Sequence, residues 1–93
     1  MLPKHVKIYL QYFDIGEQDN WQCEGCAKHD HIVNFDIHHI NGRGKGKDEI
    51  KNLICLCRKC HERAHGSNHP VSKGLFQFIH NNFLTGNRKA FLS

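Results

Sequence analysis

The sequence predicts a small α+β fold stabilised by zinc, in which a strand–loop–strand–helix core lies between two flanking helices. Three features support this prediction: the chain has only 93 residues, it contains five cysteines and nine histidines, and two C-x-x-C pairs bracket a segment with strand and helix patterns. A chain of this length fits one domain, residues 1–93. Its core alone rarely supplies more than a few kcal/mol, so we expect a metal to stabilise the fold.

The two C-x-x-C pairs predict a structural zinc site with the ligands Cys23, Cys26, Cys57 and Cys60. Such a pair with a glycine inside forms a turn that directs two thiolates at one ion. The thirty residues between the pairs exceed the roughly fifteen to twenty of a simple zinc ribbon, so a folded segment is inserted between the two halves. His29 and His31 are alternative zinc ligands. Cys55, the fifth cysteine, is expected to be a small buried hydrophobe.

The N-terminal sequence has no long apolar stretch and no small-residue cleavage site, so we expect no signal peptide. No segment approaches the roughly eighteen apolar residues of a membrane span. We therefore expect a cytoplasmic protein with reduced thiols and no membrane partner. The formal net charge of +4 is compatible with a polyanionic partner. The candidates for nucleic-acid contacts are Arg43, Lys45, Lys47, Lys51 and Arg63.

The two flanking helices are predicted from their apolar periodicity. Over residues 3–13, apolar side chains recur with the period of one helical face, and Pro3 suits the first turn. A second helix is expected over residues 73–84, with Ser72 as its N-cap and Gly86 after its end. The apolar stripe of this second helix comprises Leu75, Phe76, Ile79, Phe83 and Leu84. The tail, residues 87–93, is expected to fray.

The segment between the cysteine pairs begins with alternating apolar and polar side chains over residues 31–40, the pattern of a strand with one buried face. The side chains expected on its buried face are Val33, Phe35 and Ile37. A glycine-rich basic loop over residues 41–46 is too irregular for a tight hairpin turn. Residues 53–56 form an apolar run that can pair back as a second strand. A helix is expected over about residues 57–65.

This core also holds a second group of candidate metal ligands. His61 and His65 are four residues apart, so on a helix they share a face and can chelate one ion. His38 supplies a third candidate from the preceding strand. Three imidazoles leave open positions on a divalent ion for water and a phosphate oxygen, as catalytic metal sites do.

His39 is expected to face away from that group, because neighbours along a strand point to opposite sides. Its neutral imidazole is then the best available general base, since histidine titrates near neutral pH. Asn52 either pins the long loop and orients this base or is a simple turn residue. Asp36 is either a partner of a ligand histidine or a solvated strand residue. The histidines expected to be surface or packing residues are His5, His29, His31, His69 and His80.

These motifs match a known family. The histidine pair at positions 38–39, followed by NLICLCRKCHERAH at positions 52–65, resembles the HNH endonucleases, whose active site has the ββα-metal fold. The matching motif spans about residues 23–65 and includes the four-cysteine zinc site of many members. The resemblance implies that His39 is the base, that Asn52 positions it, and that His61 binds the catalytic metal. His38 and His65 resemble the further ligands of the colicin-type DNases, whose metal site contains only histidines.

Many members of this family carry aspartate at the position of His38. Histidine is a softer ligand and favours Zn²⁺, Ni²⁺ or Mn²⁺ relative to Mg²⁺. The sequence does not determine which of these four ions is the catalytic one. The resemblance implies a one-metal hydrolysis of phosphodiester bonds in double-stranded DNA, with 5′-phosphate and 3′-hydroxyl products. The alternatives are a non-catalytic zinc module that binds DNA or protein, and an inactive subunit with the same fold. Targeting by a partner protein is a further option.

Overall fold

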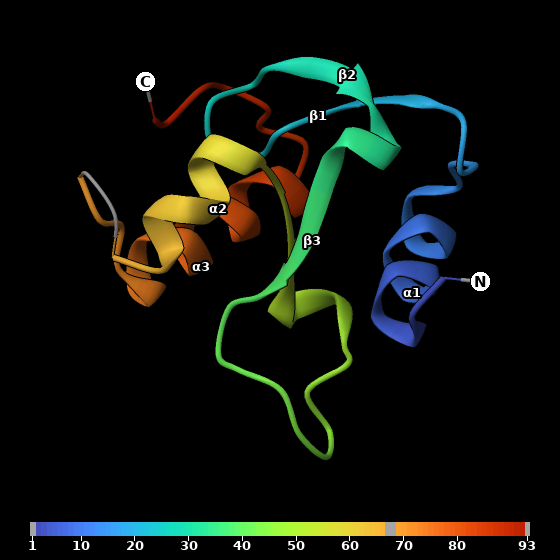
Figure 1. Cartoon of the computed structure of the whole chain (residues 1–93), viewed down its shortest axis with the longest axis horizontal. Helices are drawn as coiled ribbons and strands as arrows, with labels where there is room; N and C mark the ends of the chain where they lie inside the picture. Colours follow the sequence, from blue (N-terminus) through green and yellow to red (C-terminus); the bar gives the residue numbers. More distant parts are fainter. Residues whose placement is uncertain (1, 67–68, 93) are drawn as a thin grey trace.

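The computed structural model describes residues 2–66 and 69–92, and it has the predicted α+β class. In chain order, its α-helices and five-residue strands are α1 (Lys4–Phe13), β3 (Phe35–His39), β4 (Leu53–Cys57), α2 (Arg58–Ala64) and α3 (Lys73–Leu84). Figure 1 shows α1 on one side of the β3–β4 hairpin, with α2 and α3 on the other side. A ββα core between two flanking helices is therefore confirmed.

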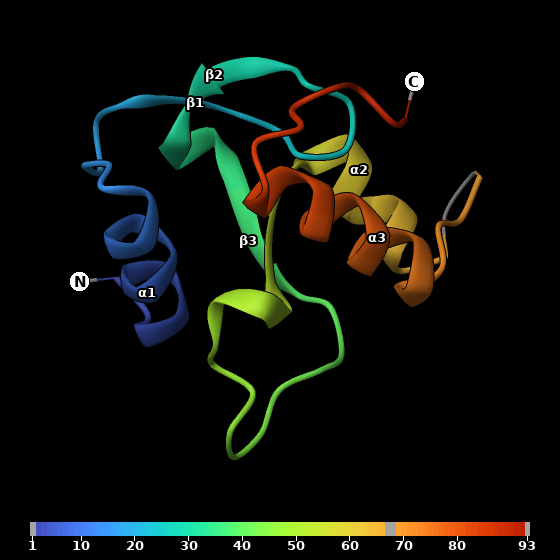
Figure 2. The ribbon, with the colours of Figure 1, turned by 180° about the vertical axis from the view of Figure 1, so that it is seen from behind.

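The β3–β4 hairpin is the centre of the molecule and carries the histidine pair. Its strands are antiparallel, with His39 opposite Leu53 and Phe35 opposite Cys57. All five side chains of β4 are buried, because α2 and α3 pack against this strand. The loop between the two strands extends away from the helices, as Figure 2 shows from behind.

Strand β3 begins four residues later than the predicted strand over residues 31–40. The 3-10 turn η1 (Ile32–Asn34) precedes it, and Val33 in this turn is 62% exposed rather than buried. Residues three apart in a 3-10 turn lie on the same side, so Ile32 and Phe35 are buried instead. The expectation for Val33 was wrong because the alternating pattern continues through a turn.

A small hairpin that the sequence did not predict holds the first cysteine pair. Strands β1 (Asn20–Gln22) and β2 (His29–His31) are antiparallel, and the cysteine pair lies in their connection. The backbone N–H of Cys23 donates to the carbonyl of Lys28 across this connection. The N–H of Glu24 donates to the carbonyl of Cys55, which joins the first cysteine pair to β4.

Helix α1 buries the face that its periodicity predicts. Tyr9 and Leu10 are buried, and Leu2, Val6 and Phe13 pack against the same core. The helix ends at Phe13, and Asp14 after it adopts the left-handed conformation with φ of 54°. The prediction of an amphipathic packing helix is confirmed.

Helix α3 has the predicted bounds and N-cap. The Ser72 hydroxyl accepts a hydrogen bond from the Leu75 N–H at 3.1 Å. Phe76, Ile79 and Phe83 are buried, but Leu75 is 40% exposed, so its assignment to the apolar stripe was wrong. Among the described residues, this twelve-residue helix is the longest, and no helix there has the length and apolar character needed to cross a membrane.

The tail after α3 packs on the first cysteine pair and does not fray through residue 92. The N–H groups of Phe91 and Leu92 both donate to the carbonyl of Gly25. The Arg88 guanidinium lies 4.3 Å from the ring centre of Phe83 and 5.0 Å from that of Trp21. The prediction of a frayed tail was wrong because Gly25 and Trp21, two of these partners, come from a distant part of the chain. Residue 93 lies outside the described residues.

Candidate active site

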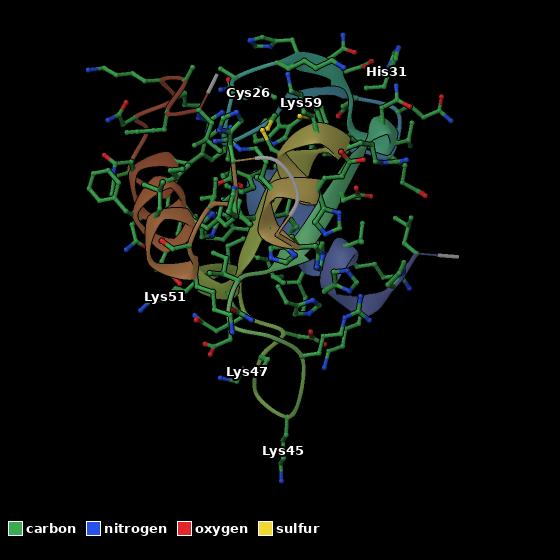
Figure 3. The ribbon with its side chains drawn as sticks, turned by 60° about the vertical axis from the view of Figure 1, so that its left-hand side comes forward. Cys26, His31, Lys45, Lys47, Lys51 and Lys59 are labelled. Atoms are coloured by element: carbon green, nitrogen blue, oxygen red, sulfur yellow. The ribbon has the colours of Figure 1, made fainter. Side chains whose placement is uncertain are left out.

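Four cysteine sulfurs converge between the β1–β2 connection and the start of α2. The Sγ atoms of the predicted ligands lie within 4.8 Å of one another: Cys23, Cys26, Cys57 and Cys60. The Sγ atoms of Cys26 and Cys57 are 3.7 Å apart, and two thiolates on a tetrahedral Zn²⁺ stand about 3.8 Å apart. These residues therefore fit a structural zinc ion. Figure 3 shows sulfur atoms gathered beside Cys26, with Lys59 near them.

Local structure and packing place these thiols. Cys57 is the N-cap of α2, and its Sγ accepts from the Cys60 N–H at 3.5 Å. A hydrogen bond from Cys60 lowers the pKa of Cys23 to about 5, which favours the thiolate that binds metal. A Cβ on Gly25 would lie 3.0 Å from Leu92 Cδ1 and 3.3 Å from Cys60 Sγ. The glycine between the first two cysteines is therefore required for close packing.

Three histidines form a second group at the junction of β3 and α2. One ligand nitrogen from each of His38, His61 and His65 lies within 4.8 Å of the others. The Nε2 atoms of His61 and His65 are 3.3 Å apart. Two nitrogens bound at about 2.0–2.1 Å to one tetrahedral ion stand about 3.3 Å apart. The structure thus brings together the three predicted ligands with a spacing that fits a divalent cation.

The surroundings of His38 and His61 affect the form in which these two rings could bind a metal ion. Burial and the neighbouring imidazoles of His61 and His65 lower the pKa of His38 to about 4, so its ring is neutral at neutral pH. Asp36 Oδ2 lies 3.0 Å from Nδ1 of His61 and 3.0 Å from Nε of Arg58. Because a carboxylate accepts, Nδ1 of His61 carries the proton and Nε2 keeps its lone pair. Asp36 therefore contacts a histidine of this group and is not a solvated strand residue.

The three convergent histidines and His39 line one cavity of about 280 Å³. The other residues that line it are Ile37, Gly42 and Arg43. The His38 ring faces α2 and α3, with its centre 5.0 Å from that of His61 and 6.1 Å from that of Phe76. His39 borders the same cavity, although its side chain faces α1. The three convergent histidines, which could hold a metal ion, and the separate imidazole of His39 thus line the same cavity.

His39 is more enclosed than the sequence suggested, with only 7% of its surface exposed. Its ring centre lies 4.5 Å from that of His5 in α1. Its Nε2 lies 2.7 Å from Oδ1 of Asp48, a residue of the loop between β3 and β4. Sequence reasoning missed both partners. His5 stood outside every motif, and no spacing pattern links Asp48 to the histidine pair.

The Asn52 side chain makes hydrogen bonds to the backbone of the β3–β4 loop, which contains Asp48. Asn52 ends the 3-10 turn η2 (Ile50–Asn52), and its side chain is buried. Its Oδ1 accepts from the N–H of Asn41 at 2.7 Å. Its Nδ2 donates to the carbonyls of Gly42 at 3.2 Å and Lys47 at 2.9 Å. Asn52 therefore fixes the two ends of the loop through the loop backbone.

The candidate nucleic-acid contacts lie around this loop and on α2. Lys45 lies at the tip of the loop and points away from the body of the protein, and Lys47 and Lys51 lie at the same end (Figure 3). These three lysines are exposed. Arg43 is exposed and lines the histidine cavity. Arg63 in α2 is half-buried, and its Nε donates to the carbonyl of His69 at 2.7 Å.

Comparison with known proteins finds one family whose sequence model matches this chain. The sequence model of the HNH endonuclease family matches residues 23–67, which include both cysteine pairs, the β3–β4 hairpin and α2. No curated protein and no solved structure matches the chain. The family indicates a nuclease or nucleic-acid-binding function. The match identifies residues 23–67 as an HNH endonuclease domain, as their motif predicted.

Proposed function

We propose that this protein is an endonuclease that hydrolyses phosphodiester bonds of double-stranded DNA with one divalent metal ion. The observation that carries this proposal is the single cavity lined by three convergent histidines, by His39 and by Arg43. A module that only binds needs the four cysteines for its stability. It has no use for a second group of metal ligands beside an enclosed imidazole.

The catalytic ion would be held by His38, His61 and His65, whose nitrogens converge with the spacing described above. Bound there, it would supply positive charge that offsets the negative charge developing on the phosphate oxygens. A ligand set of three imidazoles suits Zn²⁺, Ni²⁺ or Mn²⁺ better than Mg²⁺. Asp36 would keep His61 in the tautomer and orientation that present Nε2 to the ion.

His39 would act as the general base. It takes a proton from a water molecule while the water oxygen attacks phosphorus on the side opposite the 3′-oxygen. The bond between phosphorus and the 3′-oxygen breaks, and this oxygen keeps the electron pair and takes a proton from solvent. The products are a 5′-phosphate and a 3′-hydroxyl. Asn52 would act at a distance, by fixing the loop beside the base.

The basic residues would hold the DNA backbone. Arg43, at the cavity, is placed to contact a phosphate next to the bond that is cut. The residues proposed for further phosphate contacts are Lys45, Lys47, Lys51 and Arg63. Phosphate contacts fix the position of the duplex without reading its sequence, so we propose low intrinsic sequence specificity. Residues 1–93 would act as one domain, because α1 and α3 pack on the family core.

A plasmid assay tests the proposal. Zinc-loaded protein is incubated with supercoiled plasmid and Mn²⁺, Ni²⁺, Zn²⁺ or Mg²⁺, and the nicked and linear products are quantified with and without EDTA. We expect cleavage that depends on a divalent ion. His39→Ala should abolish this cleavage and leave DNA affinity and Mn²⁺ affinity near the parent values. His31→Ala, which alters an exposed histidine of β2, is the matched control and should cut like the parent.

Two results would contradict the proposal. A parent protein that binds plasmid but never nicks it with any of the four ions would be a non-catalytic module. A His39→Ala protein that nicks at the parent rate would remove His39 from the role of base. A single-stranded RNA and a duplex RNA in the same assay determine whether cleavage is restricted to DNA.

A further inference from the structure

His39 is held from two directions, and neither contact involves the metal group. His5 packs against its ring, with the centres 4.5 Å apart. The carboxylate of Asp48 lies 2.7 Å from its Nε2, a short distance typical of a hydrogen bond to an ionised group. An imidazole that is nearly buried and held in this way has little freedom to rotate. Its two nitrogens therefore have fixed and different surroundings.

The contact with Asp48 determines which nitrogen carries the proton. An ionised carboxylate only accepts hydrogen bonds, so Nε2 of His39 must donate. The neutral ring then keeps its lone pair on Nδ1, and Nδ1 is the atom that can accept a proton from water. The hydrogen bond from His39 also holds the pKa of Asp48 below its ordinary value, which agrees with an ionised acceptor.

The loop backbone determines where Asp48 lies. Asn52 binds the carbonyl of Lys47, the residue immediately before Asp48, at 2.9 Å, and the carbonyl of Gly42 at 3.2 Å. Gly44 and Gly46 adopt positive φ angles of 143° and 77°, so the loop contains conformations that few other residues adopt. Asn52 thus restrains a loop whose sequence would otherwise allow many conformations.

We infer that Asp48 is a positioning residue for the catalytic base: it fixes His39 in the Nε2–H tautomer and aims Nδ1 at the attacking water. This inference rests on the proposed nuclease function. The inference also gives Asn52 a physical role. Asn52 holds the backbone carbonyl of Lys47 by a hydrogen bond, and this fixes the position of the next residue, Asp48. The contacts of Asn52 described above are with the loop, and Asp48 connects them to the base.

A purely structural role for Asp48 makes a different prediction. Its side chain is 34% exposed, whereas that of His39 is 6% exposed. Ion pairs at such exposed positions contribute little to stability. Loss of the Asp48 carboxylate should therefore leave the melting temperature almost unchanged. Its effect should appear in the chemical step and in the tautomer of His39.

The test compares Asp48→Ala and Asp48→Asn with Glu49→Ala, which removes the adjacent and exposed acid. For each zinc-loaded protein we would measure kcat and KM for plasmid cleavage, Mn²⁺ affinity and melting temperature. Histidine ring ¹⁵N NMR would report the tautomer of His39, assigned by comparison with His39→Ala. The tautomer measurement is independent of activity, so it can be made even on a protein that does not cut.

We expect kcat of Asp48→Ala to fall by about 10–100-fold, by analogy with the loss of a partner that orients a metal-binding histidine. KM, Mn²⁺ affinity and melting temperature should stay near the parent values. Asp48→Asn keeps an oxygen that can accept from Nε2, so its kcat should lie between those of the parent and Asp48→Ala. His39 should be in the Nε2–H form in the parent and a mixture of tautomers in Asp48→Ala. Glu49→Ala should match the parent throughout.

Several outcomes would overturn the inference. One is an Asp48→Ala protein with the parent kcat. A second is an Asp48→Ala protein that keeps His39 in the Nε2–H form. A third is a loss of activity accompanied by a lower melting temperature and weaker Mn²⁺ binding. A parent protein that cuts no plasmid while Asp48→Ala still changes the His39 tautomer would refute the nuclease proposal and retain the Asp48–His39 contact. The two proposals can therefore fail separately.

Discussion

Glu24 and His80 form a hydrogen-bonded pair in the protein interior, with Oε1 and Nδ1 2.6 Å apart and both side chains at zero exposure. Glu24 lies between the first two cysteines, and His80 lies on α3. The other carboxylate oxygen of Glu24 accepts from the Tyr9 hydroxyl at 2.6 Å and from the Cys55 N–H at 2.9 Å. One carboxylate therefore joins the cysteine pair to α1, β4 and α3.

We expect Glu24→Ala to destabilise the zinc-loaded protein by about 3–5 kcal/mol, the range for removing one partner from a buried pair of ionisable groups. The reason is that His80 and the Tyr9 hydroxyl would lose their shared acceptor inside the core. Urea unfolding followed by circular dichroism measures the change, and Glu17→Gln at an exposed position is the control. An unchanged unfolding midpoint for Glu24→Ala would show that the pair contributes nothing to stability.

Removal of zinc should unfold the protein. Structural zinc contributes roughly 10–16 kcal/mol in small domains, which is more than a core of this size supplies. Cys57→Ser should therefore give an unfolded chain, as should a strong chelator with the parent protein. Circular dichroism and zinc content measure both effects. The control is Cys55→Ala, which removes a buried thiol outside the four-sulfur group and should keep one equivalent of structural zinc. A folded Cys57→Ser protein with a normal melting temperature would contradict the prediction.

Asp36→Asn should weaken binding of Mn²⁺ or Ni²⁺ to the histidine group by about 10–100-fold. Asp36 holds Nδ1 of His61 at 3.0 Å, and an amide at this position can no longer enforce the tautomer that presents Nε2. Isothermal titration calorimetry of the zinc-loaded protein measures the affinity for Mn²⁺ or Ni²⁺. Asp30→Asn, on the β1–β2 hairpin, is the control. Equal affinities for the parent and Asp36→Asn would show that the ligands need no such support.

Lys45→Ala should weaken DNA binding to a similar extent for every DNA sequence. The slope of log affinity against log salt concentration should become shallower by about one, the value for one lost phosphate contact. The side chain extends from the tip of the loop between β3 and β4 (Figure 3). Fluorescence anisotropy with a short duplex at several salt concentrations measures both quantities. Lys59→Ala alters an exposed lysine near the other end of the molecule in that view and should bind like the parent. If both variants behave alike, the loop is not a DNA contact.

Local patterns were sufficient for much of the fold. The two C-x-x-C pairs predicted that their four sulfurs would gather at one site, because each such turn directs two thiolates at one point. The apolar period and the Ser72 N-cap gave the bounds of α3, since both signals arise within a few residues. Val33 shows where such patterns mislead, because a 3-10 turn continues an alternating sequence without continuing a strand.

Residue types and their spacing were enough to predict the candidate metal ligands, the order of strand, loop, strand and helix, and the match to the HNH family. The position of His39 between His5 and Asp48, and the contact of Glu24 with His80, became visible only in the folded chain. Periodicity and capping act between neighbours along the chain. Contacts between residues far apart depend on how whole elements pack, and this packing arises from many weak interactions that leave no short pattern in the sequence.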